Sequence, residues 1–301
     1  MAETTYFSLL DTRGVLTVAG EDRRTYLQGL VSNDMNKVSA ARAVHAALLT
    51  AQGKYLHDFF VVEIGDVLHL DGERERLADL KRRLSLYKLR SKVTIAEALA
   101  LTVAVAWGAE APTLFGLPDE AGAATPFADG GGTAFVDPRL PALGVRIVLP
   151  REGAEERLAR IGLQRGDPAE YDRLRLSLGV PDGSRDLTVE KAILLEAGFD
   201  ELNGVDWKKG CYIGQELTAR TKYRGIVKKR LLPVAVEGAL PAPGTLVMLG
   251  DKEAGEMRSG RDGLALALLR LEALEEAAGS GAAFTADGAV LRPAKPAWAQ
   301  F

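Results

Sequence analysis

Residues 208–225 read KKGCYIGQELTARTKYRG and contain Cys211, the one cysteine of this 301-residue chain. Two lysines precede the thiol, and a helix is predicted to begin near Ile213 or Gly214, so both the lysines and the helix dipole would favour the thiolate. Gly210 and Gly214 carry no side chain and would let a planar ligand approach. The segment predicts either a reactive, ligand-contacting site or a buried cysteine in a capped helix, and spacing alone prefers neither.

Polar residues follow the cysteine at helical spacing. Gln215 supplies an amide, and Glu216 is placed one turn before Arg220, so the two charged residues are expected to pair. A single cysteine excludes an internal disulfide, and it cannot alone ligate an ordinary iron–sulfur cluster or a structural zinc ion. Redox or metal chemistry would therefore need ligands from a partner, and no metal site is predicted within the chain.

Other motifs give little support for known chemistries. The histidines His45, His57 and His69 are equally spaced in predicted strands, which leaves a metal cluster open, but ordinary strand or surface histidines are the expectation. The glycines at 130–132 have no following helix with an acidic partner, so they predict a loop rather than a nucleotide site. No GxSxG or HExxH motif is present, which argues against serine-hydrolase and zinc-peptidase chemistry.

Composition indicates a globular protein of about two domains. Apolar residues make up 47% and charged residues 26%, and no apolar run is long enough to span a bilayer. The N-terminal residues lack a signal or transit pattern, which predicts a cytoplasmic location. The net charge of −3 and the lack of an aromatic-interleaved RNA motif argue against direct nucleic-acid binding, although the basic clusters at 81–92 and 208–230 could bind an anionic ligand.

Strands and amphipathic helices alternate along the first 180 residues, which predicts an α+β fold. The apolar face formed by Leu77, Leu80 and Leu84 predicts a helix packed on a sheet, and the turn at 51–54 predicts a hairpin. Residues 116–132 are rich in Gly, Ala and Pro and predict a surface excursion. Further strands are predicted at residues 15–19, 93–95, 101–107 and 145–149.

The rest of the chain contains a second predicted helix, followed by a change in the pattern of apolar residues. Asp167 and Pro168 predict a helix start, with Tyr171, Leu174 and Leu178 on its apolar face. From about residue 226, short apolar runs alternate with Pro and Gly, which predicts a small β-barrel or sandwich.

The segment KKGCYIGQELTAR resembles the Lys-Gly-Cys-aromatic-x-Gly-Gln-Glu signature of the YgfZ family, the folate-binding relatives of the glycine-cleavage T-protein. VAGEDRRTYLQGLVSNDM, LLTAQGKYLHDF, LYKLRSKVTI and GLALALLRLE are similar to further blocks of that family. The resemblance implies a T-protein-like folate-binding fold with ferredoxin-like α/β layers around a central channel over residues 1–228, followed by a C-terminal β-barrel over 229–301. Whether residues 1–228 divide into two subdomains, with a break near 110–140, is left open.

The resemblance also implies a function: a tetrahydrofolate-binding accessory protein that supports assembly or repair of iron–sulfur enzymes, including tRNA-modifying and other radical enzymes. Its partners would be iron–sulfur clients or assembly proteins. The signature thiol is Cys211. The residues implied for the folate site are Lys209, Gly210, Gly214, Gln215, Glu216 and Arg220, with Asn33, Asp34, Gln52, Gly53 and Asp58 matching the N-terminal blocks of the channel wall. Lys208, Lys222 and Arg224 could meet the carboxylate tail of the ligand.

One position departs from the aminomethyltransferase branch, where an acidic residue holds the pterin. Ser177 stands at that place in the run RLSLG. A pterin presents an amino group and a ring N–H that pair naturally with a carboxylate, so the serine argues against aminomethyl transfer. The alternative function is a folate-dependent one-carbon transferase or demethylase that turns over a substrate.

Overall fold

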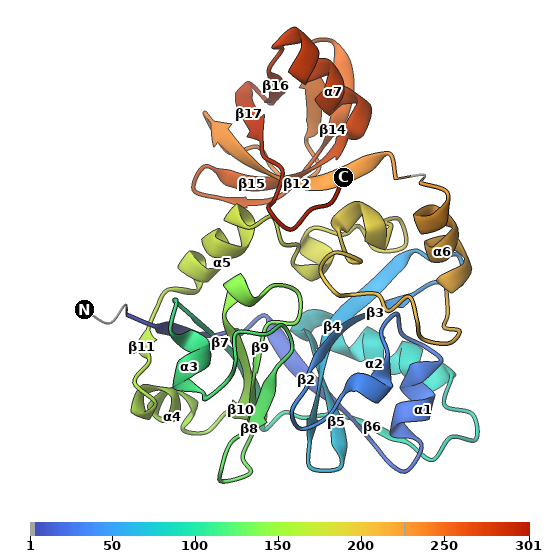
Figure 1. The fold of residues 1–301 in the computed structure, drawn as a ribbon, viewed down its shortest axis with the longest axis vertical. Coiled ribbons are helices and arrows are strands. Elements are labelled where there is room, and N and C mark those ends of the chain that lie inside the picture. The colour runs from blue at the N-terminus through green and yellow to red at the C-terminus, as the bar shows by residue number, and fades with distance from the viewer. Residues whose placement is uncertain (1–3, 226) are drawn as a thin grey trace. The chain divides into compact units, whose positions relative to one another are not determined.

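The computed structural model describes residues 4–225 and 227–301, which form two compact units (Figure 1). The first unit takes in the described residues through Leu49 together with Leu56–Pro168 and Leu202–Ile213. The second comprises Thr50–Tyr55, Ala169–Glu201 and Gly214–Phe301. No helix within these described ranges is both long and apolar enough to cross a membrane.

The first unit contains a five-stranded sheet in the order β3-β4-β5-β2-β6. Helices interrupt the strands only between β2 and β3 and between β5 and β6, where apolar residues recur at helical rather than strand spacing. As predicted, Leu77, Leu80 and Leu84 are the buried residues of α2. The elements are β2 (Arg13–Ala19), α1 (Arg23–Gln28), η1 (Met35–Lys37), β3 (Val44–Leu49), β4 (Tyr55–Ile64), β5 (Val67–Glu73), η2 (Arg74–Arg76), α2 (Leu77–Leu86) and β6 (Thr94–Glu97).

A six-stranded sheet in the order β11-β1-β7-β10-β9-β8 completes the first unit. Residues of both sheets, including Val15, Phe60, Val103 and Phe135, form one buried apolar cluster. The interpretation of residues 116–132 as a surface excursion is wrong in part, because β8 pairs with β9 there. The elements are β1 (Tyr6–Leu9), β7 (Leu101–Trp107), α3 (Ala111–Leu114), β8 (Ala124–Pro126), β9 (Thr133–Val136), η3 (Pro141–Leu143), β10 (Val145–Pro150), α4 (Ala154–Arg160) and β11 (Gln164–Arg165).

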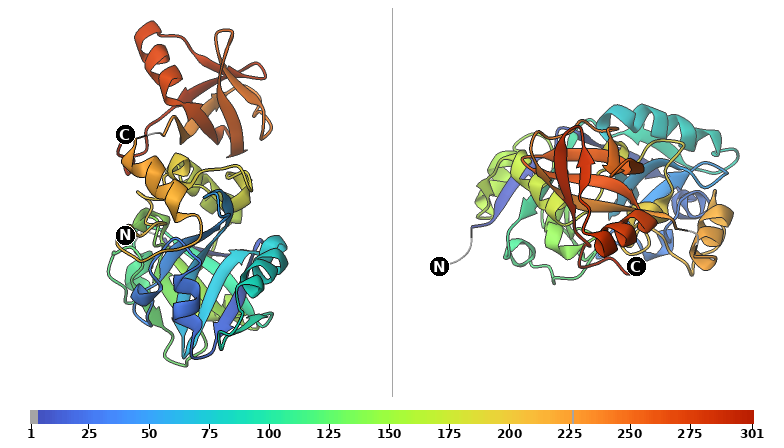
Figure 2. Two further views of the ribbon diagram at one scale, coloured as in Figure 1. Left: turned by 90° about the vertical axis from the view of Figure 1, so that its right-hand side faces the viewer. Right: turned by 90° about the horizontal axis from the view of Figure 1, so that it is seen from above.

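The second unit contains a closed six-stranded barrel in the order β12-β15-β14-β13-β16-β17, which confirms the predicted C-terminal barrel. Helix α7 packs against the barrel core through Ala273, Leu274 and Ala277 (Figure 2). The elements are α5 (Pro168–Ser177), η4 (Gly183–Arg185), η5 (Leu194–Ala197), α6 (Gln215–Tyr223), β12 (Lys229–Glu237), β13 (Leu246–Leu249), β14 (Lys252–Arg261), β15 (Leu264–Arg270), α7 (Leu271–Ser280), β16 (Phe284–Ala286) and β17 (Ala289–Pro293).

Helix α5 buries only part of the predicted face. Tyr171 is buried as predicted, but Leu174 and Leu178 are only partly buried, and the charged residues Asp172 and Arg175 are buried instead. The guanidinium of Arg175 donates to Asp172, to Asp186 and to the Ser259 hydroxyl, each over 2.7 Å. Because these charges are paired and hydrogen-bonded, the desolvation free energy of burying this ionic face is partly offset.

The three histidines are buried in the first unit with separate partners. The imidazole of His45 lies 3.0 Å from the Asp58 carboxylate, that of His57 lies 2.9 Å from Asp79, and His69 Nδ1 bonds the carbonyl of Val67. Within the described part of the chain, no group of three or more His, Cys, Asp or Glu residues could hold a metal ion. Burial is the main cause that lowers the pKa of all three imidazoles.

We expect these histidines to make the protein acid-sensitive below about pH 6.5. Burial, reinforced by Arg76 and opposed by Asp79, lowers the pKa of His57 to about 4. The unfolded chain then binds the proton more tightly than the folded one, so stability falls as pH drops from 6.5 towards 4. His57 alone would account for a loss of about 2 kcal/mol between pH 7 and pH 5. Urea unfolding at both pH values measures this, and a His57→Gln variant with an unchanged pH dependence would contradict it.

Candidate functional site

The signature cysteine lies on an irregular loop, residues 202–213, in the first unit. Cys211 is an exposed free thiol, and Gly210 beside it is also exposed, with no atom within 4 Å of where a Cβ would lie. The residues on either side, Lys209 and Tyr212, are buried. The loop therefore presents the thiol between two anchored side chains, which excludes the buried cysteine that spacing alone had left open.

Lys209 anchors this loop from inside the unit. Its side chain is 8% exposed, and its ammonium donates to the carbonyl oxygens of Gln28, Val31 and Asn33 over 2.8, 2.5 and 2.8 Å. Burial lowers the pKa of Lys209 to about 8, while Asp34 and Asp206 act in the opposite direction. An ammonium has three N–H donors. Since all three donate to backbone carbonyls, the structure gives Lys209 an anchoring role.

Asp206 shapes the turn that leads to the thiol. Its Oδ1 accepts from the backbone N–H groups of Lys208 and Lys209 over 2.7 and 3.2 Å, and its Oδ2 forms an ion pair of 2.6 Å with Lys37. Burial alone would raise the pKa of this carboxyl, but the bonds from Lys37 and the two N–H groups lower it. The aspartate therefore remains charged and fixes the backbone of the two residues that precede Gly210.

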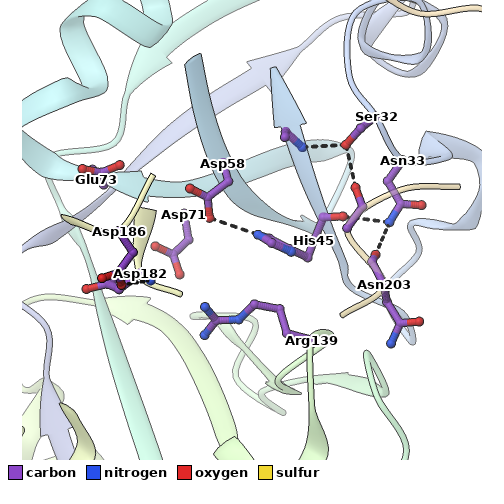
Figure 3. Close-up of polar contacts among 12 residues, drawn as sticks. Ser32, Asn33, His45, Asp58, Asp71, Glu73, Arg139, Asp182, Asp186 and Asn203 are labelled. Atoms are coloured by element: carbon purple, nitrogen blue, oxygen red, sulfur yellow. Dashed lines mark hydrogen bonds and ion pairs between the residues drawn. The ribbon is translucent and has the colours of Figure 1, made fainter. Parts of the chain in front are cut away.

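Ser32 and Asn33 join the same loop to strand β3 (Figure 3). The Ser32 hydroxyl donates to the carbonyl of Gly204 over 2.6 Å. The Asn33 amide donates to the carbonyls of His45 and Asn203, each over 2.7 Å, and its oxygen accepts from the N–H of Asp34. The predicted residue Asn33 thus has its amide committed to the protein, and Asp34 caps η1 by accepting from Asn36.

The same unit contains a buried network of arginines and carboxylates, and Figure 3 shows two of its members, Asp71 and Arg139, near His45 and Asp58. The ring of Phe60 stands at its centre. The guanidinium carbons of Arg13, Arg139 and Arg146 lie 5.6, 4.8 and 4.0 Å from the ring centroid, and the His45 ring stacks on Phe60 at 5.1 Å. Cation–π attraction is strongest where the cation is desolvated, as it is here.

Two carboxylates form ion pairs with these three guanidinium groups. Asp71 accepts from Arg13 over 2.7 Å and from Arg146 over 2.6 Å, and Asp137 accepts from Arg139 over 2.8 Å. This network was not predicted from the sequence. A signal was present, because Asp71 and Arg146 stand inside apolar strand sequences, VLHLDGE and VRIVLP, where charges are rare unless paired.

The second half of the signature lies in the second unit, at the start of α6. Gly214 has a φ of 81° and is the N-cap of the helix, a conformation that favours glycine. Glu216 and Arg220 form the predicted pair over 2.9 Å, and both side chains are largely exposed. Gln215 is the first residue of the helix and is partly buried. An exposed pair of this kind stabilises a helix only slightly.

The hairpin turn that carries Gln52 and Gly53 packs against this helix start. A Cβ on Gly53 would lie 2.9 Å from the Gly214 carbonyl oxygen and 2.9 Å from the Leu217 Cβ. Gly53 also has a φ of 70°. The fold therefore brings the two predicted glycines together and leaves Gln52 exposed at the tip of the turn.

The remaining predicted positions have separate surroundings. Ser177 is exposed and its hydroxyl donates to the Leu174 carbonyl over 2.8 Å. Lys222 forms an ion pair with Asp200 over 2.6 Å, whereas Lys208 and Arg224 are exposed. Asp58 is buried against His45.

Comparison with known proteins gives close sequence relatives. The chain is 34% identical over 288 residues to "Iron-sulfur cluster assembly factor IBA57, mitochondrial" of Mus musculus, covering 88% of this chain and 78% of the relative. The human protein of the same name is 34% identical over 287 residues with the same coverage. The corresponding homolog of Aspergillus fumigatus is 30% identical, covering 90% of this chain and 71% of the relative.

A domain model and a solved structure agree with the fold. Residues 228–301 match the family model described as the CAF17 C-terminal beta-barrel domain. The crystal structure of the glycine cleavage system aminomethyltransferase T from Bartonella henselae superposes with a TM-score of 0.77 at 13% identity, covering 96% of this chain and 84% of that chain. The predicted T-protein-like fold is thereby confirmed.

These relatives correct the prediction of a cytoplasmic location. The mouse and human proteins are named as mitochondrial, and so is the Neurospora crassa homolog, which is 33% identical over 248 residues. The prediction relied on N-terminal residues without a targeting pattern, and such a stretch does not by itself assign a compartment. All three of these relatives carry the IBA57 name, whereas the sequence motif had suggested YgfZ.

Proposed function

The chain belongs to the family of IBA57 iron–sulfur cluster assembly factors, and on that premise we propose that it is an accessory protein for the assembly of iron–sulfur enzymes. The observation that carries the proposal at the level of residues is the exposed thiol of Cys211 on an anchored loop. A thiol in this position is accessible to a partner protein, whereas a core cysteine would be inert.

The cluster is the cargo in this proposal, and Cys211 supplies at most one thiolate to it. Iron–sulfur clusters are ordinarily held by four cysteine thiolates or by cysteine with histidine. The chain has one cysteine, and the described residues contain no group of three or more ligand side chains. A cluster in contact with Cys211 must therefore take its other ligands from the partner. If the partner supplied three ligands to the cluster, one iron would remain available to bind the Cys211 thiolate.

The loop geometry suits a transient ligand. Lys209, Asp206 and Asn33 hold the backbone around the thiol through buried hydrogen bonds, so little conformational entropy remains to be lost when a partner docks. Gly210 places no side chain next to Cys211, and both residues are exposed, so a bulky cluster held by another protein could approach the thiol.

Iron–sulfur enzymes that modify tRNA, and other radical enzymes, are the proposed clients. Cells that lack the gene should lose activity of several such enzymes, while enzymes without clusters keep theirs. Expression of the wild-type chain should restore the lost activities. Normal activity of every iron–sulfur enzyme tested in the deficient cells would refute the proposed function.

Tetrahydrofolate, which the family resemblance implies as ligand, does not fit the side chains assigned to it. Lys209 and Asn33 donate their polar hydrogens to protein carbonyls, and Asp58 is buried against His45. Among the other carboxylates of the set, Asp34 accepts from the N–H of Asn36 and Glu216 is paired with Arg220. No step of the proposed function therefore runs through folate.

Folate binding is nevertheless directly testable. A ligand that binds the folded chain raises its melting temperature as its concentration increases. The poor fit of the assigned residues predicts no shift with tetrahydrofolate, in contrast to what the family resemblance alone implies. A concentration-dependent rise would show that a folate site exists elsewhere in the chain. The one-carbon transferase alternative gains nothing from Ser177, which is exposed and bonded to its own helix.

A further inference from the structure

A pocket of about 290 Å³ lies within the second unit, in the other unit from Cys211. Its walls come from the hairpin turn before β4, from residues 186–197, and from strands β12, β14 and β15 of the barrel. One part of the wall is apolar and is made by Leu187, Ile193, Leu231 and Leu268. The volume suits a small molecule rather than a whole cofactor.

Basic side chains make up much of the remaining wall. Lys54, Lys191 and Lys229 line the pocket, and no hydrogen bond or ion pair of their ammonium groups occurs among residues 4–225 and 227–301. Lys37 and Lys252, for comparison, each pair with a carboxylate, whereas the exposed Lys208 and Lys228 do not line the pocket. Three uncommitted ammonium groups around one small cavity produce a positive potential inside it.

Arg258 adds a buried guanidinium to the same pocket. Its side chain is nine-tenths buried, and Nη1 bonds Glu256 and the carbonyl of Met257. Its Nε is buried and has no hydrogen-bond partner among the described residues. A charged donor left unsatisfied in a protein interior is costly and calls for an explanation, such as a bound group that the unliganded chain lacks.

The acidic residues of the pocket leave this positive charge uncompensated. Asp186 accepts from Arg175 and from Ser259, and Glu256 pairs with Arg258. Glu196 is the remaining carboxylate of the wall, and Lys229, Lys54 and Arg258 are the cations that act on it. Two lysines and one arginine therefore act on this carboxylate, and with Lys191 also in the wall the pocket carries an excess of positive charge.

We propose that this pocket binds a small organic carboxylate, with Lys54, Lys229 and Arg258 contacting the carboxylate and the apolar wall contacting its carbon chain. Arginine and lysine donors recognise carboxylate oxygens through charge-assisted hydrogen bonds. Inorganic phosphate would satisfy the cations but would gain nothing from Ile193, Leu231 and Leu268, so an organic anion fits better. The site goes beyond the iron–sulfur role and does not depend on Cys211.

Isothermal titration of the full chain with glutarate tests the proposal. Glutarate should bind the wild type, and Lys54→Gln and Lys229→Gln should each weaken binding about tenfold. Lys228→Gln is the matched control, because Lys228 is the exposed neighbour of Lys229 and does not line the pocket. Glu196→Gln should tighten binding several-fold, since it removes the negative charge that opposes the ligand.

Three results would overturn the proposal. The first is no glutarate binding by the wild type at concentrations up to about 10 mM. The second is an equal loss in Lys228→Gln, which would indicate non-specific attraction to surface charge. The third is binding of phosphate but not of glutarate, which would exclude an organic carboxylate as the ligand. None of them bears on the Cys211 loop, so the iron–sulfur proposal would stand or fall separately.

Discussion

A Lys209→Met variant is expected to unfold with a free energy lower than that of the wild type by about 3 kcal/mol. The ammonium of Lys209 satisfies the carbonyls of Gln28, Val31 and Asn33, and methionine fills similar space without any donor. Relief of the desolvated charge recovers only part of the loss, because three acceptors lose their partner together. Chemical denaturation at pH 7 measures the difference.

Lys208→Met is the matched control for that experiment. Lys208 is the exposed neighbour of Lys209, and its side chain should contribute less than about 0.5 kcal/mol. The two roles considered for Lys209 give different results. An anchoring lysine costs stability when replaced, whereas a ligand contact costs binding and leaves stability near that of the wild type, so an unchanged unfolding free energy would contradict the anchoring role.

An Asp71→Asn variant is expected to lose about 3–5 kcal/mol of stability. Asp71 is fully buried and accepts from both Arg13 and Arg146, so the neutral amide would leave two buried guanidinium groups without their counter-charge. The amide is also a poorer partner because its NH₂ group would place hydrogen-bond donors opposite the N–H donors of the guanidinium groups. Thermal or urea unfolding measures the loss.

The exposed carboxylate of Asp66 provides the comparison for Asp71. Its side chain is fully exposed and lies 3.6 Å from Arg23, so Asp66→Asn should change stability by less than about 0.5 kcal/mol. Should Asp71→Asn match this small effect, the arginines around Phe60 would have to be neutralised by other groups, and the described network would not be a major source of stability.

The parts of the fold that follow local periodicity could be predicted from the sequence. Helix α2 was predicted from Leu77, Leu80 and Leu84, and the barrel from regularly interrupted apolar runs. Strand β8 was missed because its residues, Ala124–Pro126, have low strand propensity, and it forms through pairing with β9. The buried face of α5 was missed because its charges are paired by residues distant in sequence.

The candidate site shows the same division between local and distant effects. The Glu216–Arg220 pair and the helix start at Gly214 were predictable because they depend on residues within one or two turns. The role of Lys209 was not, because its three acceptors lie 176–181 positions earlier in the chain. Sequence spacing also could not decide whether Cys211 is exposed, since that depends on how Lys209 is buried.

We expect iron–sulfur enzymes to depend on this chain through the exposed thiol of Cys211. The most direct measurement is the activity of several iron–sulfur enzymes in cells that lack the native gene and express wild type, Cys211→Ser, Cys211→Ala or Lys208→Met. Both cysteine variants should fail to restore activity while unfolding within about 0.5 kcal/mol of the wild type, since the side chain is exposed, and Lys208→Met should restore it. Full rescue by both cysteine variants would contradict the claim.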